Sequence, residues 1–424
     1  MQNLTLQVPQ PSHFYAVLDY GDTYVQPLLL SALSKRLPAN SYTLLAPGTT
    51  PPDSRVLYIQ QYEALPFGEI MSQSSTVLAN AYVIRKALIR KHYLATTAFN
   101  WGTKYPDSAL KRHVKPTVSF EVDYAEFLDD ALVEAWELHE SFASNADKPE
   151  EEKEWWILKP GMSDRGQGIR LFNSEEQLQA IFEEWEADLP STDDEAEDEE
   201  GEEGEGDGIM TSQLRHFVAQ PYIHPPLLLR DNPYKFHIRT YVLAVGALKV
   251  YVYKQMLALF AGTPYIAPWD ITAGENGPDL SAHLTNTCLQ DGTRDGSVQT
   301  FFSLPSLQPG LPETWKTDVF TQICSTTGEL FEAAARGMGV HFQPLPNAFE
   351  VFGLDFVVDA SGTAYLLEVN AFPDFKQTGE ELNGVVEGLW EGVVDRAVRP
   401  FFGVEGGEEK GDMVLCCDVD LGRR

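Results

Sequence analysis

Cysteine, positive charge and long apolar runs are all scarce in this 424-residue chain. The four cysteines show neither a CxxC pairing nor a metal-binding spacing, which argues against a zinc centre and a disulfide framework and favours free thiols. No uncharged apolar run reaches the roughly 18 residues that a membrane-spanning helix needs. Residues 1–10 lack the basic start and apolar centre of a secretory signal. We therefore expect a cytoplasmic protein without a membrane segment.

Acidic residues outnumber basic ones by 63 to 31, and the formal net charge is −32. A chain of this charge repels nucleic-acid phosphates, so direct nucleic-acid binding is not expected. Eleven of the acidic residues lie between positions 193 and 207, in a run rich in glycine and glutamate. Such a composition cannot bury an apolar core, and it predicts a disordered insert over residues 186–212.

The apolar periodicity of the remaining chain predicts an α/β (α+β) protein in which short strands and helices mix. A helix is expected over residues 75–93, which end in a basic cluster. No internal repeat is present. The predicted organisation is a small N-terminal α/β lobe over residues 1–72, linker helices over 73–153, a larger two-lobed region over 154–402, and a flexible Gly- and Glu-rich tail over 403–424.

Two carboxylates and an amide gather on a hairpin predicted over residues 349–369. Because side chains alternate between the two faces of a strand, Asp355, Glu368 and Asn370 share one face, with Asp355 opposite Leu366 and diagonal to Glu368. Carboxylates about 7 Å apart repel each other unless a cation lies between them, and oxygen ligands suit Mg²⁺ shared with phosphates. A solvated polar face is the alternative. The other face is expected to be all core, with Leu354, Phe356, Val358, Tyr365, Leu367 and Val369.

Cationic groups alternate along a predicted strand that begins at Tyr234 and reads Tyr-Lys-Phe-His-Ile-Arg-Thr. The period of two places Lys235, His237 and Arg239 on one face. Groups at intervals of about 7 Å along a strand can bind phosphates. The alternative is an exposed basic edge strand that prevents aggregation.

Two loops complete the candidate chemistry. Lys159 ends a predicted strand and precedes a Gly-rich turn over residues 161–168, whose backbone N–H groups can lie over phosphates. The turn is neither a Walker motif nor a dinucleotide fingerprint, because no helix begins at Gly168. His283 and Asn286 lie three residues apart in a second loop and can orient a substrate, although ordinary loop hydrogen bonding explains them as well.

Taken in this order, the motifs resemble the tubulin–tyrosine ligase family and its polyglutamylase and polyglycylase relatives, over about residues 75–400. The segments that carry the resemblance are the strand lysine with its Gly-rich loop, Gln-Pro-Tyr-Ile, Lys-Phe-His-Ile-Arg, His-Leu-Thr-Asn, Phe-Gly-Leu-Asp-Phe and Leu-Glu-Val-Asn. The resemblance implies an ATP-grasp fold with nucleotide between a central and a C-terminal lobe. It also implies an ATP- and Mg²⁺-dependent ligase that joins tyrosine to the C-terminal tail of α-tubulin through an acyl phosphate. We expect a monomer.

The resemblance further implies roles for individual residues. Those expected to contact ATP are Lys91, Lys159, Arg165, Gly166, Gly168, Ile169, Gln220, Tyr222, Ile223 and Lys235. The expected Mg²⁺ ligands are Asp355, Glu368 and Asn370. The residues expected at the transferred phosphoryl group or the acceptor carboxylate are Arg239, Lys254, His237 and Asn286. Lys86 is a rival for the place of Lys91.

Two positions depart from the family pattern. The family strand usually reads Lys-Phe-Asp-Ile-Arg, and His237 here replaces the acid, which changes the local charge by up to two units. Lys254 stands where the family has an arginine, so the charge is kept but the bidentate fork is lost. Four functions therefore stay open: a tyrosine ligase, a polyglutamylase- or polyglycylase-like ligase, a degenerate ATP-binding scaffold in cytoplasmic RNA–protein bodies (P-bodies), and an unrelated carboxylate–amine ligase with a small-molecule acceptor. The acidic run at 193–207 is either a solvated loop or a competitor of the acceptor tail.

Overall fold

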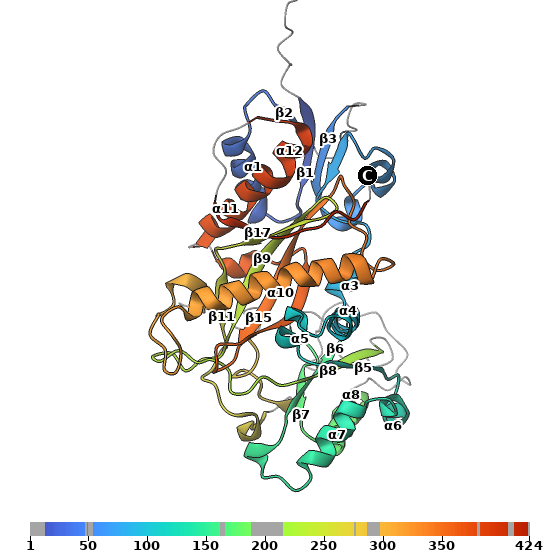
Figure 1. Ribbon diagram of the computed structural model, residues 1–424, viewed down its shortest axis with the longest axis vertical. Helices are drawn as coiled ribbons and strands as arrows, with labels where there is room; N and C mark the ends of the chain where they lie inside the picture. Colours follow the sequence, from blue (N-terminus) through green and yellow to red (C-terminus); the bar gives the residue numbers. More distant parts are fainter. Residues whose placement is uncertain are drawn as a thin grey trace, which may run out of the picture.

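The computed structural model describes residues 13–46, 49, 54–161, 166–187, 215–274, 277–285, 297–379, 382–405 and 411–422. Its elements form an N-terminal, a central and a C-terminal lobe, and the C-terminal lobe lies between the other two along the long axis of the molecule (Figure 1). Among the described residues, no helix is long and apolar enough to span a membrane. The acidic run at 193–207 lies outside the described residues.

The N-terminal lobe is a four-stranded parallel sheet in the order β2-β1-β3-β4. Its elements are β1 (Phe14–Asp19), α1 (Val25–Arg36), β2 (Tyr42–Leu45), β3 (Val56–Gln60), α2 (Phe67–Ser72) and β4 (Val77–Ala79). Helix α1 packs on α11 (Asn383–Val393) near the other end of the chain. The ring of Phe14 stacks on Phe402 with centroids 4.0 Å apart. The first and last parts of the chain therefore share one apolar core.

The region predicted to hold linker helices is more varied than its composition indicates. It comprises β4, α3 (Lys86–Ile89), α4 (Lys91–Lys104), α5 (Ala109–His113), β5 (Val118–Glu121), α6 (Leu128–Leu132) and α7 (Trp136–Asn145). The continuous helix expected over 75–93 is wrong. Its first apolar residues are buried and pair with β3 as β4, so a tertiary contact overrides their helical pattern.

The central lobe is an antiparallel sheet in the order β5-β8-β6-β7, with β6 (Trp156–Pro160), β7 (Arg170–Phe172) and β8 (His216–Pro221). Helix α8 (Glu175–Ala187) covers one face and buries Phe182 and Trp185. Both rings contact Phe217 of β8 with centroids within 6 Å. This aromatic core fixes β6 and β8, whose ends carry Lys159 and Gln220.

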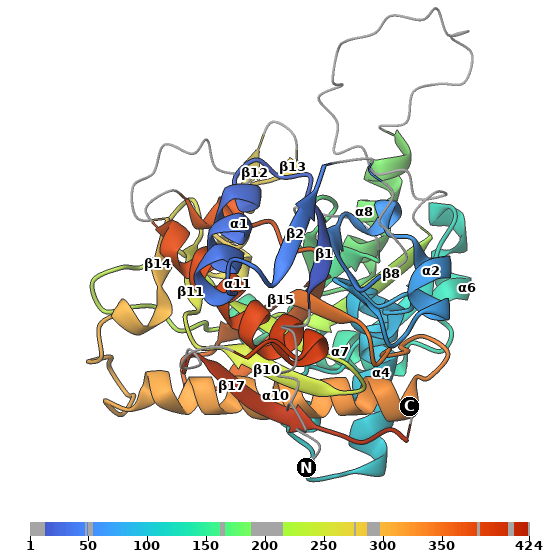
Figure 2. The ribbon, with the colours of Figure 1, turned by 90° about the horizontal axis from the view of Figure 1, so that it is seen from above.

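The C-terminal lobe is built on a seven-stranded sheet with β9 (Phe236–Val245) and β15 (Phe349–Val358) at its centre. The remaining strands are β10 (Lys249–Tyr253), β11 (Leu257–Phe260), β14 (Val298–Thr300), β16 (Ala364–Ala371) and β17 (Met413–Asp418). Helix α10 (Trp315–Gly337) covers one face, and α1, α11 and α12 (Arg399–Phe402) cover the other (Figure 2). Alternate residues of β9 enter the two cores, as period two requires.

The C-terminal segment differs from the flexible tail expected over 403–424. Strand β17 pairs antiparallel with β10, from Lys249↔Asp418 to Tyr253↔Met413. The segment before β17 is rich in glycine and glutamate, and this composition led to the prediction of a flexible tail. The short apolar run Met-Val-Leu-Cys-Cys that follows pairs with the edge of the sheet. The pairing leaves Cys417 buried against the α10 core.

Candidate active site

A cavity lies between the central sheet and the C-terminal sheet. One wall comes from β6 and β8, the other from β9, β15 and β16, and the first residue of α4 closes one end. Basic side chains from both sides face the carboxylates of the C-terminal wall. The described residues that line the cavity include Lys91, Lys115, Ile157, Lys159, Gly166, Ile169, Gln220, Tyr222, Ile223, Lys235, His237, His283, Thr285, Asp355, Val357, Leu366, Leu367, Glu368 and Asn370.

The register of the β15–β16 hairpin differs from the predicted one. Asp355 lies directly opposite Glu368, and Phe356 lies opposite Leu366, so Leu367 is an extra residue in a β-bulge. The bulge turns Leu367 and Glu368 to the same side of the sheet. Leu366 consequently enters the core, whereas Tyr365 and Leu367 leave it. The predicted grouping of Asp355, Glu368 and Asn370 on one face is confirmed.

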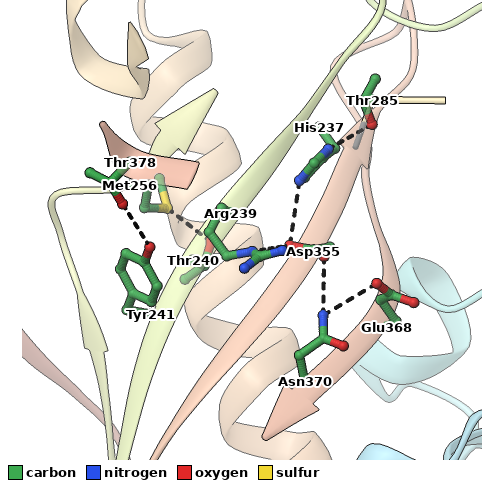
Figure 3. A network of polar contacts seen from close by, with 10 residues as sticks. All are labelled: His237, Arg239, Thr240, Tyr241, Met256, Thr285, Asp355, Glu368, Asn370 and Thr378. Carbon is green, nitrogen blue, oxygen red and sulfur yellow. Dashed lines mark hydrogen bonds and ion pairs between the residues drawn. The ribbon is translucent and has the colours of Figure 1, made fainter. Parts of the chain in front are cut away.

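Arg239 and Asp355 form a buried ion pair between neighbouring strands (Figure 3). The guanidinium donates from Nε to Oδ1 at 2.5 Å and from Nη2 to Oδ2 at 3.1 Å. Burial alone would lower the pKa of Arg239, but the carboxylate of Asp355 raises it above its ordinary value. The guanidinium is therefore permanently charged and held in one orientation.

Glu368 lies next to Asp355 and close to two lysines. The Nδ2 group of Asn370 donates to Asp355 at 3.3 Å and to Glu368 at 3.2 Å, and thus bridges the carboxylates. Burial would raise the pKa of Glu368, but the charges of Lys91 and Lys159 lower it to about 2. Lys91 Nζ lies 3.7 Å from Glu368. The rival Lys86 is exposed and does not line the cavity.

Lys159 projects from the opposite wall. Its ammonium group donates to Gln220 Oε1 at 3.0 Å, and Gln220 Nε2 in turn donates to Thr117 Oγ1 at 2.8 Å. Burial lowers the pKa of Lys159 to about 8. Gln220, which is predicted to contact ATP, lines the cavity and also orients Lys159.

A second buried lysine lies among aromatic side chains. Lys235 Nζ donates to Tyr222 Oη at 3.0 Å, and that hydroxyl lies 2.7 Å from His283 Nδ1. Burial and the nearby charge of Lys159 lower the pKa of Lys235 to about 7. Burial and Lys235 also lower the pKa of His283 to about 3, so the imidazole is neutral. Lys235 is therefore an amine that is partly unprotonated near neutral pH and gains a proton readily once an anion enters the cavity.

His237 lies between Thr285 and Asp355. Its Nδ1 lies 2.6 Å from Thr285 Oγ1, and its Nε2 lies 3.6 Å from Asp355 Oδ1 without a hydrogen-bond partner among the described residues. Burial lowers the pKa of His237. A neutral imidazole thus presents an unpaired nitrogen toward the carboxylate wall.

The structure does not bring every predicted residue to the cavity. Gly166 and Ile169 line it, and Gly166 and Gly168 have positive φ angles of 84° and 68°, which glycine adopts without strain. Lys254 is exposed near Phe302, because the chain bends between β10 and β11 and turns its side chain away from the site. The predicted residues Arg165 and Asn286 lie outside the described residues.

Several lining residues were not predicted. Lys115 precedes β5 and adds a further cation. Ile157, Val357, Leu366 and Leu367 supply apolar surface, which suits a planar ring such as a nucleobase. An isolated lysine in a loop and core-type aliphatic residues carry no sequence signal of a site, whereas Thr285 lay within the His-Leu-Thr-Asn motif and was overlooked.

The polar groups of the carboxylate wall fit a hard divalent cation. Asp355 and Glu368 supply carboxylate oxygens, and Asn370 can present its carbonyl oxygen after rotation of the amide. Among the described residues, no group of three His, Cys, Asp or Glu side chains could hold an ion. The two carboxylates and the amide oxygen of Asp355, Glu368 and Asn370 match Mg²⁺, which takes one or two carboxylates and completes its shell with phosphate oxygens and water.

Comparisons with known proteins agree with this geometry. A probable tubulin–tyrosine ligase of Schizosaccharomyces pombe is 45% identical over 395 residues, which cover 91% of each chain. The probable tubulin–tyrosine ligase PBY1 of Saccharomyces cerevisiae is 42% identical over 394 residues, 89% of this chain and 51% of the relative, so this chain spans about half of that protein.

A solved structure has the same architecture. The C-terminal domain of Kluyveromyces lactis Pby1, described as an ATP-grasp enzyme interacting with the mRNA decapping enzyme Dcp2, matches with a TM-score of 0.69 and 36% identity over 96% of this chain and 99% of that one. The model of the tubulin–tyrosine ligase family matches residues 78–404. The chain therefore belongs to the tubulin–tyrosine ligase family and has the ATP-grasp fold.

Proposed function

We propose that this protein is an ATP- and Mg²⁺-dependent ligase that joins an amino acid, tyrosine in the first instance, to a protein carboxylate. The observation that carries the proposal is the pairing of two chemistries across one cavity. Lys91, Lys159 and Lys235 supply positive charge for phosphates, and Asp355 and Glu368 supply the oxygens that a divalent cation needs.

The chain's own residues divide the work of binding. Lys91 and Lys159 lie close enough to Glu368 to hold phosphate oxygens beside the metal ligands. The apolar residues around Ile157 and Leu367 accept the base and exclude water from it. Asp355, Glu368 and Asn370 would hold Mg²⁺, which supplies charge neutralisation for the transferred phosphoryl group.

The reaction follows from the weakness of a carboxylate as an electrophile. The acceptor carboxylate takes the γ-phosphoryl group of ATP, which releases ADP and forms an acyl phosphate. The amine of the donor attacks the acyl carbon, phosphate leaves, and an amide bond remains after loss of a proton. Arg239 lies at the carboxylate wall in a fixed orientation and would stabilise the charge of the transferred group.

The donor and acceptor are assigned from the relatives. Two of them are named probable tubulin–tyrosine ligases, which supports tyrosine and the C-terminal tail of α-tubulin, met in the cytoplasm or at microtubules. More distant relatives are named polyglycylases and polyglutamylases, so glycine and glutamate are the alternative donors.

The test is label transfer. Purified protein is incubated with Mg²⁺-ATP, radiolabelled tyrosine and detyrosinated tubulin, beside Glu368→Gln and the control Glu332→Gln, a half-buried glutamate on α10 outside the cavity. Wild type and the control should label α-tubulin equally, whereas Glu368→Gln should fall at least about 100-fold, because roughly 2.7 kcal/mol of transition-state stabilisation is lost. The assay is repeated with labelled glycine and labelled glutamate. If the wild type transfers none of the three amino acids, tyrosine, glycine or glutamate, the proposal is overturned.

A second candidate is an ATP-binding scaffold in the cytoplasmic bodies where messenger RNA is decapped (P-bodies). Two observations favour it: His237 replaces the family acid, and the structural relative is described as interacting with the decapping enzyme Dcp2. Under this candidate the wild type binds ATP but transfers no label, and His237→Asp restores transfer. Measurable label transfer by the wild type, at the same level as by His237→Asp, would exclude the scaffold.

A further inference from the structure

A second concave surface lies on the outer side of the central lobe, separate from the carboxylate wall of the ATP cavity. This groove has a volume of about 660 Å³. Its lining residues come from α4, from β5 with the residue before it, and from the segment that runs from α6 into α7; Figure 1 labels these elements. Of its lining residues, Thr117 alone also serves the proposed ligase site, through its bond to Gln220.

The floor of the groove is an edge strand. In the sheet order β5-β8-β6-β7, β5 has β8 on one side and, among the described residues, no strand on the other. Val118 faces the core, whereas Thr117 and Ser119 are more exposed and also line the groove. An edge strand leaves alternate backbone N–H and C=O groups unpaired, and an added strand can bond to them.

Exposed apolar side chains border this edge. Phe99 on α4 is 69% exposed and Val133 after α6 is 62% exposed, and both line the groove. Ala95 and Ala131 widen it between them. Large apolar side chains left in water on both sides of an open strand mark a contact surface. They provide sites for alternate side chains of a strand laid along β5.

The charge of the groove selects its occupant. Asp130, Glu134 and Glu137 line it, and no Lys or Arg does so among the described residues. A basic segment is therefore attracted, and the acidic run at 193–207 of this chain is repelled, as is the acidic tail of tubulin. This excludes the acceptor of the proposed reaction as the occupant.

We infer that the groove formed by α4, β5 and the α6–α7 segment binds an extended, basic segment of a partner protein, which adds a strand to β5 and places apolar side chains against Phe99 and Val133. The binding site is distinct from the ATP cavity. Its occupancy requires neither ATP nor catalysis, so the inference stands or falls independently of the proposed ligase activity.

The test uses peptides of defined sequence. The full chain is used to select from a random 16-residue peptide library displayed on phage, and the most enriched peptide is synthesised and titrated by fluorescence anisotropy. We expect sequences with at least two Lys or Arg and apolar residues at alternate positions. Affinity should fall at least about fivefold in Phe99→Ser and Val133→Ser, and in the charge reversal Glu134→Lys.

Matched controls separate the groove from general surface stickiness. Met71 and Val340 are 63% and 75% exposed and lie outside the groove. Met71→Ser and Val340→Ser should leave peptide affinity unchanged. Acidic selected sequences, competition by ATP, equal losses in the controls, or dimerisation of the chain through the groove would each overturn the inference.

Discussion

The two walls of the candidate active-site cavity balance their charges in different ways. On the C-terminal wall, Arg239 and Asp355 neutralise each other through two buried hydrogen bonds. On the central wall, Lys159 is bonded to the neutral amide of Gln220, and no carboxylate among the described residues lies within ion-pair distance of it. The Arg239–Asp355 pair on the first wall is electrostatically complete without ligand, whereas Lys159 on the second wall carries a charge that an anionic ligand would neutralise.

The difference separates stability from binding. A buried ion pair is costly to break, because its remaining partner stays charged in a poor solvent. A buried lysine with a neutral partner costs free energy in the folded state, and an anionic ligand relieves that cost. Substitutions on the two walls should therefore have opposite signatures in unfolding and in ATP binding.

The largest expected effect is on the complete wall. Arg239→Met leaves Asp355 buried and unpaired, and should lower the free energy of unfolding by about 3–5 kcal/mol. Lys159→Met removes a buried charge and should leave that free energy unchanged or raise it. Urea denaturation followed by fluorescence compares both variants with the control Arg336→Met. This control removes a surface ion pair with Glu332 on α10 and should change the free energy of unfolding by less than about 0.5 kcal/mol. Equal losses for Arg239→Met and Lys159→Met would break the comparison.

The next effect is on the wall that awaits a ligand. Lys159→Met should weaken binding of a non-hydrolysable ATP analogue by about 10- to 100-fold, which corresponds to roughly 1.4–2.7 kcal/mol. Isothermal titration calorimetry measures the affinity, with the exposed Lys86→Met as the matched control. An unchanged affinity in Lys159→Met would show that this lysine does not face the phosphates.

Proton uptake provides a sharper test of the same idea. The pKa of Lys235 is about 7 and that of Lys159 about 8, so both lose protons as the pH rises from 6.5 to 8.5. Phosphates favour the charged amines, and analogue binding at pH 8 should take up on the order of one proton, less at pH 6.5. Titrations in buffers of different ionisation enthalpy report the uptake. Lys235→Met should reduce it, and no uptake in the wild type contradicts the account.

The smallest expected effect on ATP-analogue binding comes from Thr117, which supports Lys159 through Gln220. Thr117→Val deprives Gln220 Nε2 of its acceptor and should weaken analogue binding by about 2- to 10-fold, because one hydrogen bond contributes about 0.5–1.5 kcal/mol. Thr103→Val on α4, whose hydroxyl bonds only within its own helix, is the control. An effect of the same size in both would show that the bond to Gln220 is unimportant.

Period-two patterns predicted the carboxylate wall well, because β9 and β15 are long, paired on both sides and continuous. The same patterns could not reveal the bulge at Leu367, since one extra residue changes the register without changing the composition. They also did not reveal the hydrogen bond between Gln220 and Thr117, which joins residues about a hundred positions apart.

Short segments were the least predictable. The sequence patterns predicted a helix where β4 forms and a flexible tail where β17 forms. Each of these short strands is stabilised by pairing with another strand, β3 for β4 and β10 for β17, and such pairing leaves no local signal in the sequence. Lys254 was placed at the site from a family pattern, but the bend before β11 directs it outward. The predictions for Arg165 and Asn286 lie outside the described residues.

The most direct test of the ligase assignment follows the oxygen atoms of the acceptor. An acceptor tail labelled with ¹⁸O in its carboxylate is incubated with protein, Mg²⁺-ATP and tyrosine, and the released phosphate is analysed by mass spectrometry. The acyl-phosphate route transfers one carboxylate oxygen to phosphate, so each product amide should be matched by one phosphate carrying ¹⁸O. Amide product accompanied by phosphate without ¹⁸O would contradict the account.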